Sequence, residues 1–205
     1  MKKLLTTGFM LAALSFAPAM AQQPQPFNPD PAAVRAGTYA LDASHGKITW
    51  TVSHLGLSRY TGQLTDVQAE LRLDPKAPDQ GSLRVTIPLE KGGTLDADLD
   101  KHLRAADFFD TAKHPEARFV STRIERTGDR TARVTGDLTL RGVTRPVAFE
   151  ARFNTAGVHP VTKRYTLGFD GTATLKRSEF GMGYMVPAVS DEVALHLAGE
   201  FQIVE

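Results

Sequence analysis

The sequence has no cysteine among its 205 residues, so neither a disulfide nor a cysteine-linked lipid anchor can form. It also has no block of basic residues: 24 Lys and Arg are interspersed with 23 Asp and Glu. Surfaces that bind nucleic acid or anionic membranes usually carry a basic cluster, so we expect neither partner. A folded domain of this composition must be held together by its apolar core.

Motifs for catalysis and metal binding are also missing. The sequence contains no G-x-S-x-G and no H-E-x-x-H, and its six histidines lack metal-ligand spacing. Ser53 and His54 are adjacent, so on an extended strand they point to opposite faces and do not form a catalytic pair. We therefore expect no catalytic residue, no metal site and no enzymatic cofactor.

One long apolar run is present, at the N-terminus. Two lysines precede an apolar stretch from Leu4 to Ala17, and Ala19 and Ala21 supply small residues for cleavage. This order is typical of a secretory signal peptide, so residues 1–21 are predicted to be removed. The run is too short to span a bilayer after cleavage, and no stop-transfer segment follows. We expect export to a bacterial periplasm, with Gln22 as the first mature residue.

Residues 22–37 hold four prolines and three glutamines, a composition typical of a linker. We interpret them as an arm outside the core. The folded domain is then predicted to cover residues 38–205.

Most of this domain alternates apolar and polar residues with a period of two. The clearest case is 132–153, where two alternating runs flank the dipeptide Arg141-Gly142, which predicts an antiparallel hairpin with one apolar face. A change of phase within 60–73 is interpreted as a bulge or bend near Thr65-Asp66. Similar alternation occurs in 48–54, 83–89, 117–126, 165–175 and 193–203, and in the last run His196 alternates with the apolar face and should be exposed.

The period changes to that of a helix only once. Leu95, Leu99 and Leu103 recur every four residues after Thr94, a suitable N-cap. This predicts one amphipathic helix from Leu95 to about Ala106, acting as a plug or a lid. The fold class is therefore all-β: an antiparallel up-and-down barrel of about eight strands with one amphipathic helix.

The interior of such a barrel is either filled by side chains or holds one slender ligand. Small residues on the apolar faces would leave room for a ligand, although glycine can also mark a bend. The small residues in question are Gly62, Ala69, Gly136, Ala151, Gly171, Ala173 and Gly199.

Two further features carry alternative interpretations. His54 shares an apolar face with Trp50 and Val52, so it is either a hydrogen-bonded core histidine or a donor to the polar end of a ligand. The segment 177–192, rich in Gly and Met, is either a surface loop or an adaptable apolar mouth.

Four motifs in succession resemble those of the YceI-like, polyisoprenoid-binding family: WTVSHLGLSRYTGQL, HLRAADFFDTAKHPEARF, GDLTLRGVTRPV and KRSEFGMGYMVPAVSDEVAL. The resemblance covers essentially Thr38 to Glu205. It implies a lipocalin-like barrel that holds a long isoprenoid or an isoprenoid quinone. His54, Phe108, Phe109 and Phe180 match motif positions of the family.

The resemblance implies a protein that binds an isoprenoid lipid for carriage or storage and does not transform it. The alternatives are a hydrolase or other enzyme acting on such a lipid, and a stress-related protein with a filled core. No stable membrane anchor is expected, and transient membrane contact for lipid exchange is left open. The predicted ligand-binding residues, from motif positions and from alternation, are Trp50, Val52, His54, Phe108, Phe109, Leu138, Phe149, Phe169, Phe180 and Leu197.

Overall fold

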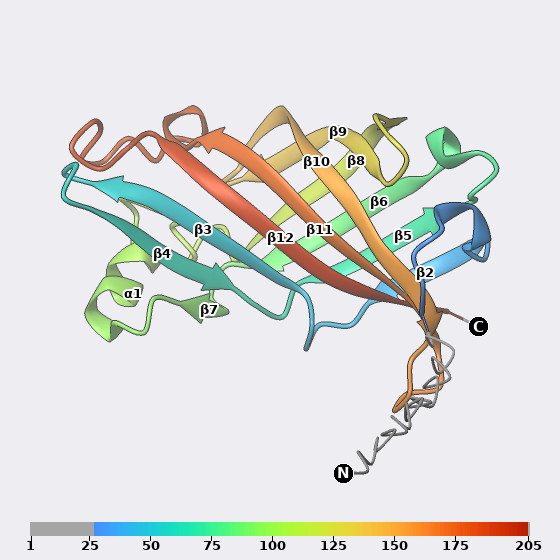
Figure 1. The fold of residues 1–205 in the computed structure, drawn as a ribbon. Helices are drawn as coiled ribbons and strands as arrows, with labels where there is room; N and C mark the ends of the chain where they lie inside the picture. Colours follow the sequence, from blue (N-terminus) through green and yellow to red (C-terminus); the bar gives the residue numbers. More distant parts are fainter. Residues whose placement is uncertain (1–26, 205) are drawn as a thin grey trace, which may run out of the picture.

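The computed structural model describes residues 27–204, which form antiparallel strands around one apolar interior (Figure 1). The predicted signal peptide lies outside the described residues. The strands are β1 (Phe27–Asn28), β2 (Gly37–Leu41), β3 (Lys47–His54), β4 (Ser58–Leu64), β5 (Gln68–Leu73), β6 (Ser82–Pro88), β7 (Gly92–Gly93), β8 (Glu116–Arg126), β9 (Thr131–Leu140), β10 (Val143–Val158), β11 (Tyr165–Lys176) and β12 (Glu192–Ile203). The helices are η1 (Pro31–Ala33), η2 (Pro78–Gln80), α1 (Ala97–Arg104) and η3 (Arg177–Phe180).

Eight of these strands close into a barrel in their sequence order. The order is β2-β5-β6-β8-β9-β10-β11-β12, and β12 pairs with β2 to complete the ring. All the pairs are antiparallel, so the predicted up-and-down barrel is confirmed. Closure matters for function because it removes sheet edges and encloses an interior.

The predicted hairpin over 132–153 is formed by β9 and β10. Its two turn residues have positive φ angles, 54° at Arg141 and 74° at Gly142. Two consecutive residues in this region make the kind of turn that matches the right-handed twist of paired strands. The turn therefore fixes the register in which Leu140 faces Val143.

The phase change within 60–73 is the predicted bend: it lies at Asp66, in a break between two strands, and the alternative of a bulge within one strand is wrong. β4 ends at Leu64 and pairs with β3, whereas β5 begins at Gln68 and pairs with β2 and β6. Asp66, with φ 55°, lies in the connection. The chain thus leaves the hairpin β3–β4 and enters the barrel wall, and a new strand begins there with its own phase.

The hairpin β3–β4 extends the barrel wall beyond the ring. β12 pairs with β2 through its last residues, Phe201 to Ile203, and with β3 through Ala194 to Ala198. β2 and β3 therefore lie along the same edge of β12, one after the other. In Figure 1, β3, β4, α1 and the connection from β11 to β12 gather at one end of the barrel, and β2 lies at the other.

The helix is shorter than predicted. It begins at Ala97, and its N-cap is Asp96, whose side chain accepts hydrogen bonds from the backbone amides of Asp98 and Leu99. Leu95 has φ 69° and is 107% exposed, so it is outside the helix and contributes nothing to its apolar face. A carboxylate that caps two amides sets the start of this helix in place of the predicted Thr94 cap.

The N-terminal arm is part of the folded unit from Phe27 onward. The expectation of a linker outside the core is wrong for residues 27–37, while residues 22–26 lie outside the described part of the chain. β1 pairs with β10, and Asp30 caps η1 by accepting from the amide of Ala32 at 2.9 Å. Val34 is then buried in the core, so the arm covers one end of the barrel.

Two apolar clusters pack the two halves of the barrel. One lies in the half near α1 and includes Phe119, Leu138 and Phe180; the other lies in the half under the arm and includes Tyr39, Leu167 and Phe201. We call the end formed by 54–58, α1, the turn 141–142 and 177–191 the mouth end. The opposite end, formed by 27–36, 74–81 and 127–130, is the arm end.

Candidate functional site

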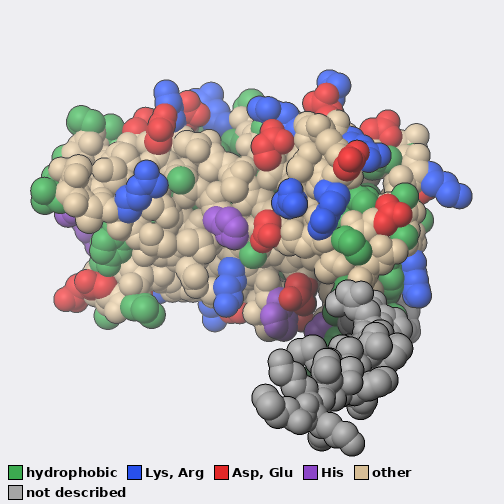
Figure 2. Space-filling view, in the orientation of Figure 1, with side chains coloured by type: hydrophobic (Ala, Val, Ile, Leu, Met, Phe, Trp, Pro, Cys, Tyr) green, Lys and Arg blue, Asp and Glu red, His purple; other side chains and the backbone are tan. Residues whose placement is uncertain are grey.

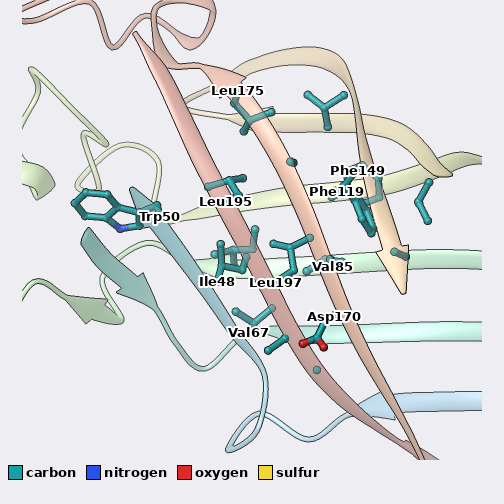
Figure 3. Close-up of a pocket in the computed structure, with 18 of the residues that line it drawn as sticks. Ile48, Trp50, Val67, Val85, Phe119, Phe149, Asp170, Leu175, Leu195 and Leu197 are labelled. Atoms are coloured by element: carbon teal, nitrogen blue, oxygen red, sulfur yellow. The ribbon is translucent and has the colours of Figure 1, made fainter. Parts of the chain in front are cut away.

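The interior of the barrel is a long apolar cavity of about 1020 Å³. Its walls come from every strand of the ring and from β3, β4 and α1. Figure 3 shows side chains from opposite walls, such as Leu195 of β12 and Phe119 of β8, projecting toward the same interior. A volume of this size is typical of sites for small organic ligands. The small residues Ala69, Ala151 and Ala173 line it.

All ten residues predicted from the sequence line this cavity. They differ in burial: Phe180 is 1% exposed and Leu138 is 7% exposed, whereas most of the others are half-buried. Phe149 lies edge-to-face on Phe119, with ring centroids 5.7 Å apart. Toward the arm end, Phe169 contacts Phe153 with tilted rings and Phe201 edge-to-face. Alternation was sufficient to place the side chains on strands, because the closed ring turns one face of every strand inward. Phe108, Phe109 and Phe180 lie outside the strands, and their prediction came from motif positions.

The glycines contribute less empty space than expected. A Cβ at Gly62 would lie 2.6 Å from Cε2 of Trp50, and one at Gly136 would lie 2.8 Å from Cε2 of Phe119. Aromatic rings of neighbouring strands already occupy these positions, and neither glycine lines the cavity. The interpretation that Gly62 and Gly136 leave room for a ligand is therefore wrong. They let large rings lie flat against the wall.

The connection 177–191 folds over the mouth end around a buried arginine. Arg177 is 5% exposed and donates to the carbonyl oxygens of Met182, Tyr184, Val189 and Ser190 at 2.6 to 2.9 Å. Burial lowers its pKa from the usual value, but an arginine keeps its proton in proteins. A single side chain therefore holds most of this segment. The segment is more than a surface loop, because two of its own residues, Phe180 and Met182, are buried in the core.

Three aromatic rings meet where this segment approaches α1. His102 of α1, Phe108 just after it and Tyr184 of the connection lie edge-to-face with centroids 5.0, 5.5 and 5.7 Å apart. All three line the cavity. Arg141 ties the same region together, since its guanidinium donates to the carbonyl oxygens of Ala106 and Gly181. The helix and the connection thus meet across the mouth as one covering layer.

His54 lies at the rim of the cavity and is exposed to solvent. The interpretation as a core histidine is therefore wrong. Its strand ends there because the chain turns at Leu55 and Gly56, which have φ angles of 55° and 70°. The backbone of His54 also forms an isolated bridge with Val189. Exposed His196 lies on the outside of β12, as predicted.

The arm end supplies cavity residues that the sequence reasoning missed. Asp30, Pro31 and Val34 line the cavity, together with Arg130 of the turn between β8 and β9. The signal was present, because Asp30-Pro31 is an N-cap followed by proline at the first helical position. Arg177 was missed because nothing in its local sequence indicates burial.

Within residues 27–204, no helix has both the length and the apolar composition needed to cross a membrane. In the same part of the chain, no three His, Cys, Asp or Glu side chains converge as metal ligands would.

Comparison with known proteins shows the family of this barrel. The model of the YceI-like domain family matches residues 39–201, from within β2 to within β12. The chain belongs to the YceI-like family. Its curated relatives include a "UPF0312 protein" of Pseudomonas savastanoi pv. phaseolicola, 40% identical over 149 residues that make up 72% of this chain and 77% of the relative. Another, from Ectopseudomonas mendocina, is 38% identical and covers 80% of this chain and 87% of the relative.

Solved YceI-like structures have the same fold. Burkholderia cenocepacia BcnA has a TM-score of 0.71 at 26% identity, covering 78% of this chain and 98% of that protein. The Campylobacter jejuni YCEI protein has a TM-score of 0.66 at 26% identity, covering 74% and 90%. A domain of Saccharophagus degradans, described as polyisoprenoid binding, has a TM-score of 0.61 at 13% identity, covering 83% and 100%, and shows likeness of fold.

Proposed function

We propose that this protein binds one long isoprenoid lipid, or an isoprenoid quinone, in its barrel and carries or stores it without chemical change. The observation behind the proposal is the apolar cavity of about 1020 Å³ that runs along the barrel interior. Each buried CH₂ contributes about 0.8 kcal/mol, so a slender hydrocarbon chain needs no charged contact to bind. The solved polyisoprenoid-binding domain of the same fold supports this ligand class.

The polar end of the ligand is proposed to lie at the mouth end. The middle of the cavity is lined by aliphatic and aromatic residues, whereas His54, His102 and Tyr184 provide polar atoms at the mouth. Because a polar group without a hydrogen-bond partner is costly to bury, a head group should stay near these side chains and near solvent. The tail would then extend toward Phe169 in the arm half.

The two alternative functions, a protein with a filled core and an enzyme, each require a different interior. A protein with a filled core would have no cavity of this size, so the open interior counts against it. An enzyme would need at least two catalytic groups facing one reactive atom. His54 at the rim, His102 on α1 and Tyr184 are the titratable candidates at the mouth, and we propose that they contact a ligand and do not catalyse a reaction.

Solvent extraction followed by lipid mass spectrometry tests the proposal. Purified protein should release an unmodified isoprenoid in near-stoichiometric amount, and stripped protein should take it up again. A protein that is empty and cannot be loaded would contradict the proposal. Turnover of added lipid that disappears in His54→Ala would favour the enzyme.

Export to the periplasm is also proposed, on the pattern of residues 1–21. The intact mass of protein recovered from the periplasm should correspond to a chain that begins at Gln22. A product that retains Met1, or that occurs only in the cytoplasm, would contradict export.

A further inference from the structure

Two surface segments at the mouth end contain no charged residue. Residues 53–58 read SHLGLS and residues 181–190 read GMGYMVPAVS, and neither contains Asp, Glu, Lys or Arg. Charged residues make up 23% of the chain, so a surface without them is unusual for this protein. A solvated loop normally carries charge, and its absence here indicates contact with something apolar.

The two segments form one structure. The amide of Leu55 donates to the carbonyl oxygen of Ala188 at 2.8 Å, and the amide of Ser190 donates to that of Ser53 at 2.9 Å. The amide of Ser53 also donates to Oγ of Ser190 at 2.9 Å. Behind them, Arg177 fixes the second segment through its four carbonyl acceptors. The apolar side chains on both segments are therefore presented together.

These side chains are large and exposed. We call them the apolar rim: Leu55 (50% exposed), Leu57 (83%), Tyr184 (46%), Met185 (44%) and Val186 (37%). Figure 2 shows hydrophobic side chains gathered at this end of the molecule. Exposed apolar side chains are ordinary when scattered, but a group of five on two joined segments marks an interaction site.

The rim is continuous with the cavity. Tyr184 and Met185 belong to the rim and also line the cavity, and Val189 of the same segment lines it as well. An apolar surface thus runs from the interior of the barrel out to the tips of both segments. A lipid leaving the cavity would meet this surface first.

We propose that the apolar rim inserts into the acyl layer of a lipid bilayer, so that the ligand passes between bilayer and cavity without crossing water. This inference rests on the proposed function, because it assumes a cargo that normally resides in a membrane. The bilayer fits better than a protein partner because the rim offers no ionic contact and continues into a lipid-sized cavity. It also differs from a basic membrane-binding surface, which would require anionic lipid.

The charges next to the rim define the kind of bilayer. The segment 96–107, which contains α1, carries four aspartates against one lysine and one arginine. Arg59 and Asp191, which directly follow the two rim segments in the chain, are opposite in charge. The acidic balance of 96–107 therefore opposes attraction to anionic head groups, and insertion is driven by apolar burial. Binding should therefore occur on zwitterionic phosphatidylcholine vesicles, should not increase with phosphatidylglycerol, and should not weaken in high salt.

Flotation of the full-length mature protein with phosphatidylcholine vesicles tests the inference, with Leu57→Asp as the variant. Leu57 is 83% exposed and does not line the cavity, so its replacement should leave the fold and the ligand site intact. Loss of one leucine from the acyl layer and gain of a charge should weaken vesicle binding by about tenfold or more. Val161→Asp is the matched control, since Val161 is 80% exposed but lies in the connection between β10 and β11, at the end of the barrel away from the rim. It should bind vesicles like the wild type.

The inference would be overturned if the wild type did not bind vesicles, or if Leu57→Asp bound them as well as the wild type. It would also be overturned if Leu57→Asp and Val161→Asp lost binding to the same extent, or if binding required anionic lipid and disappeared in high salt. Self-association through the rim, seen as a concentration-dependent dimer that Leu57→Asp abolishes without any vesicle binding, would assign the rim to a second copy of the chain instead.

A loading assay separates this inference from the proposed function. Wild type and Leu57→Asp should load an isoprenoid quinone equally from detergent solution, while transfer from vesicles should be slower in the variant. Equal loading and equal transfer overturn the docking inference and leave the proposed function standing. Failure of every protein to load from detergent overturns the proposed function, whatever the vesicles show.

Discussion

The indole ring of Trp50 occupies the space that a side chain at Gly62 would need. The two residues are direct partners in the ladder between β3 and β4, and a Cβ at Gly62 would lie 2.6 Å from Cε2 of Trp50. The ring therefore lies against β4 at Gly62, and Trp50 also lines the cavity. This pairing places the only tryptophan of the chain as a reporter in the cavity wall.

Trp50 emission should be blue-shifted relative to free tryptophan and should change when an isoprenoid quinone is added. The reason is its half-buried position in the wall of the cavity. Gly62→Val should displace the ring and shift the emission of the ligand-free protein. Gly183→Ala is a suitable control, because a Cβ there meets no atom within 4 Å. Trp50 emission that is changed neither by the ligand nor by Gly62→Val would refute this placement.

Phe149→Trp should block ligand uptake while the protein still folds, because Phe149 is half-buried and faces the cavity. Leu138→Phe should instead overpack the buried cluster around Leu138 and lower the free energy of unfolding by about 1–3 kcal/mol. Thermal melting and lipid mass spectrometry on the same samples distinguish the two effects. A Phe149→Trp protein that still carries stoichiometric lipid would show that the ligand does not pass this point.

Arg177→Met should loosen the connection 177–191 and speed ligand release. It removes four hydrogen bonds from a charged donor, each contributing about 1.5–3 kcal/mol, although water can partly replace them once the segment opens. Amide hydrogen exchange of 181–190 should rise far more than that of the barrel strands. Arg145→Met, at an exposed position of β10, provides the comparison and should melt like the wild type.

His54→Phe keeps the bulk of the side chain and removes its hydrogen bonds. If His54 contacts the polar end of the ligand, affinity should fall by about 0.5–1.5 kcal/mol, and the ligand tail should bind as before. Isothermal titration with a quinone, compared with a hydrocarbon that has the same tail and no head group, measures the difference. Equal quinone affinity in both proteins would mean that His54 makes no such contact.

The barrel should lose stability at high pH through Tyr39. Burial, helped by the nearby Tyr165, raises the pKa of Tyr39 from 10.0 to about 12, and its hydroxyl donates to the carbonyl oxygen of Arg35. The folded state therefore keeps the phenol neutral while the unfolded state ionises. This contribution to stability is complete below pH 10 and is lost as the pH rises from 10 to 12.

Tyr39→Phe should be less stable at neutral pH but should lack this part of the alkaline decline. The difference is measured by denaturant unfolding of both proteins at a series of pH values from neutral to 12. Parallel curves for wild type and Tyr39→Phe would contradict the role of Tyr39.

The interior-facing residues could be predicted because they follow from local alternation. Trp50, Phe149, Phe169 and Leu197 each lie in a run of period two, and closing the ring turns each run inward. The hairpin at Arg141-Gly142 is equally local, since two residues with positive φ suffice to make the turn. Such features depend on near neighbours in the chain, which a sequence displays directly.

Other failures share the opposite property. The arm from Phe27 onward pairs with β10, more than a hundred residues away, and the propensity of a single segment does not fix such a contact. The space beside Gly62 depends on a ring from another strand, and residue size alone cannot show whether that space is empty or filled.

The sequence by itself determined the class of fold, the apolar interior and the charge-free segments 53–58 and 181–190, because alternation and composition are properties of the chain. Only the tertiary structure decided that these two segments join in one rim and that Arg177 is buried beneath one of them. It also decided that the arm covers the far end of the barrel. Residues more than a hundred positions apart, such as Ser53 and Ser190, meet there, and their contacts exist only once the ring has closed.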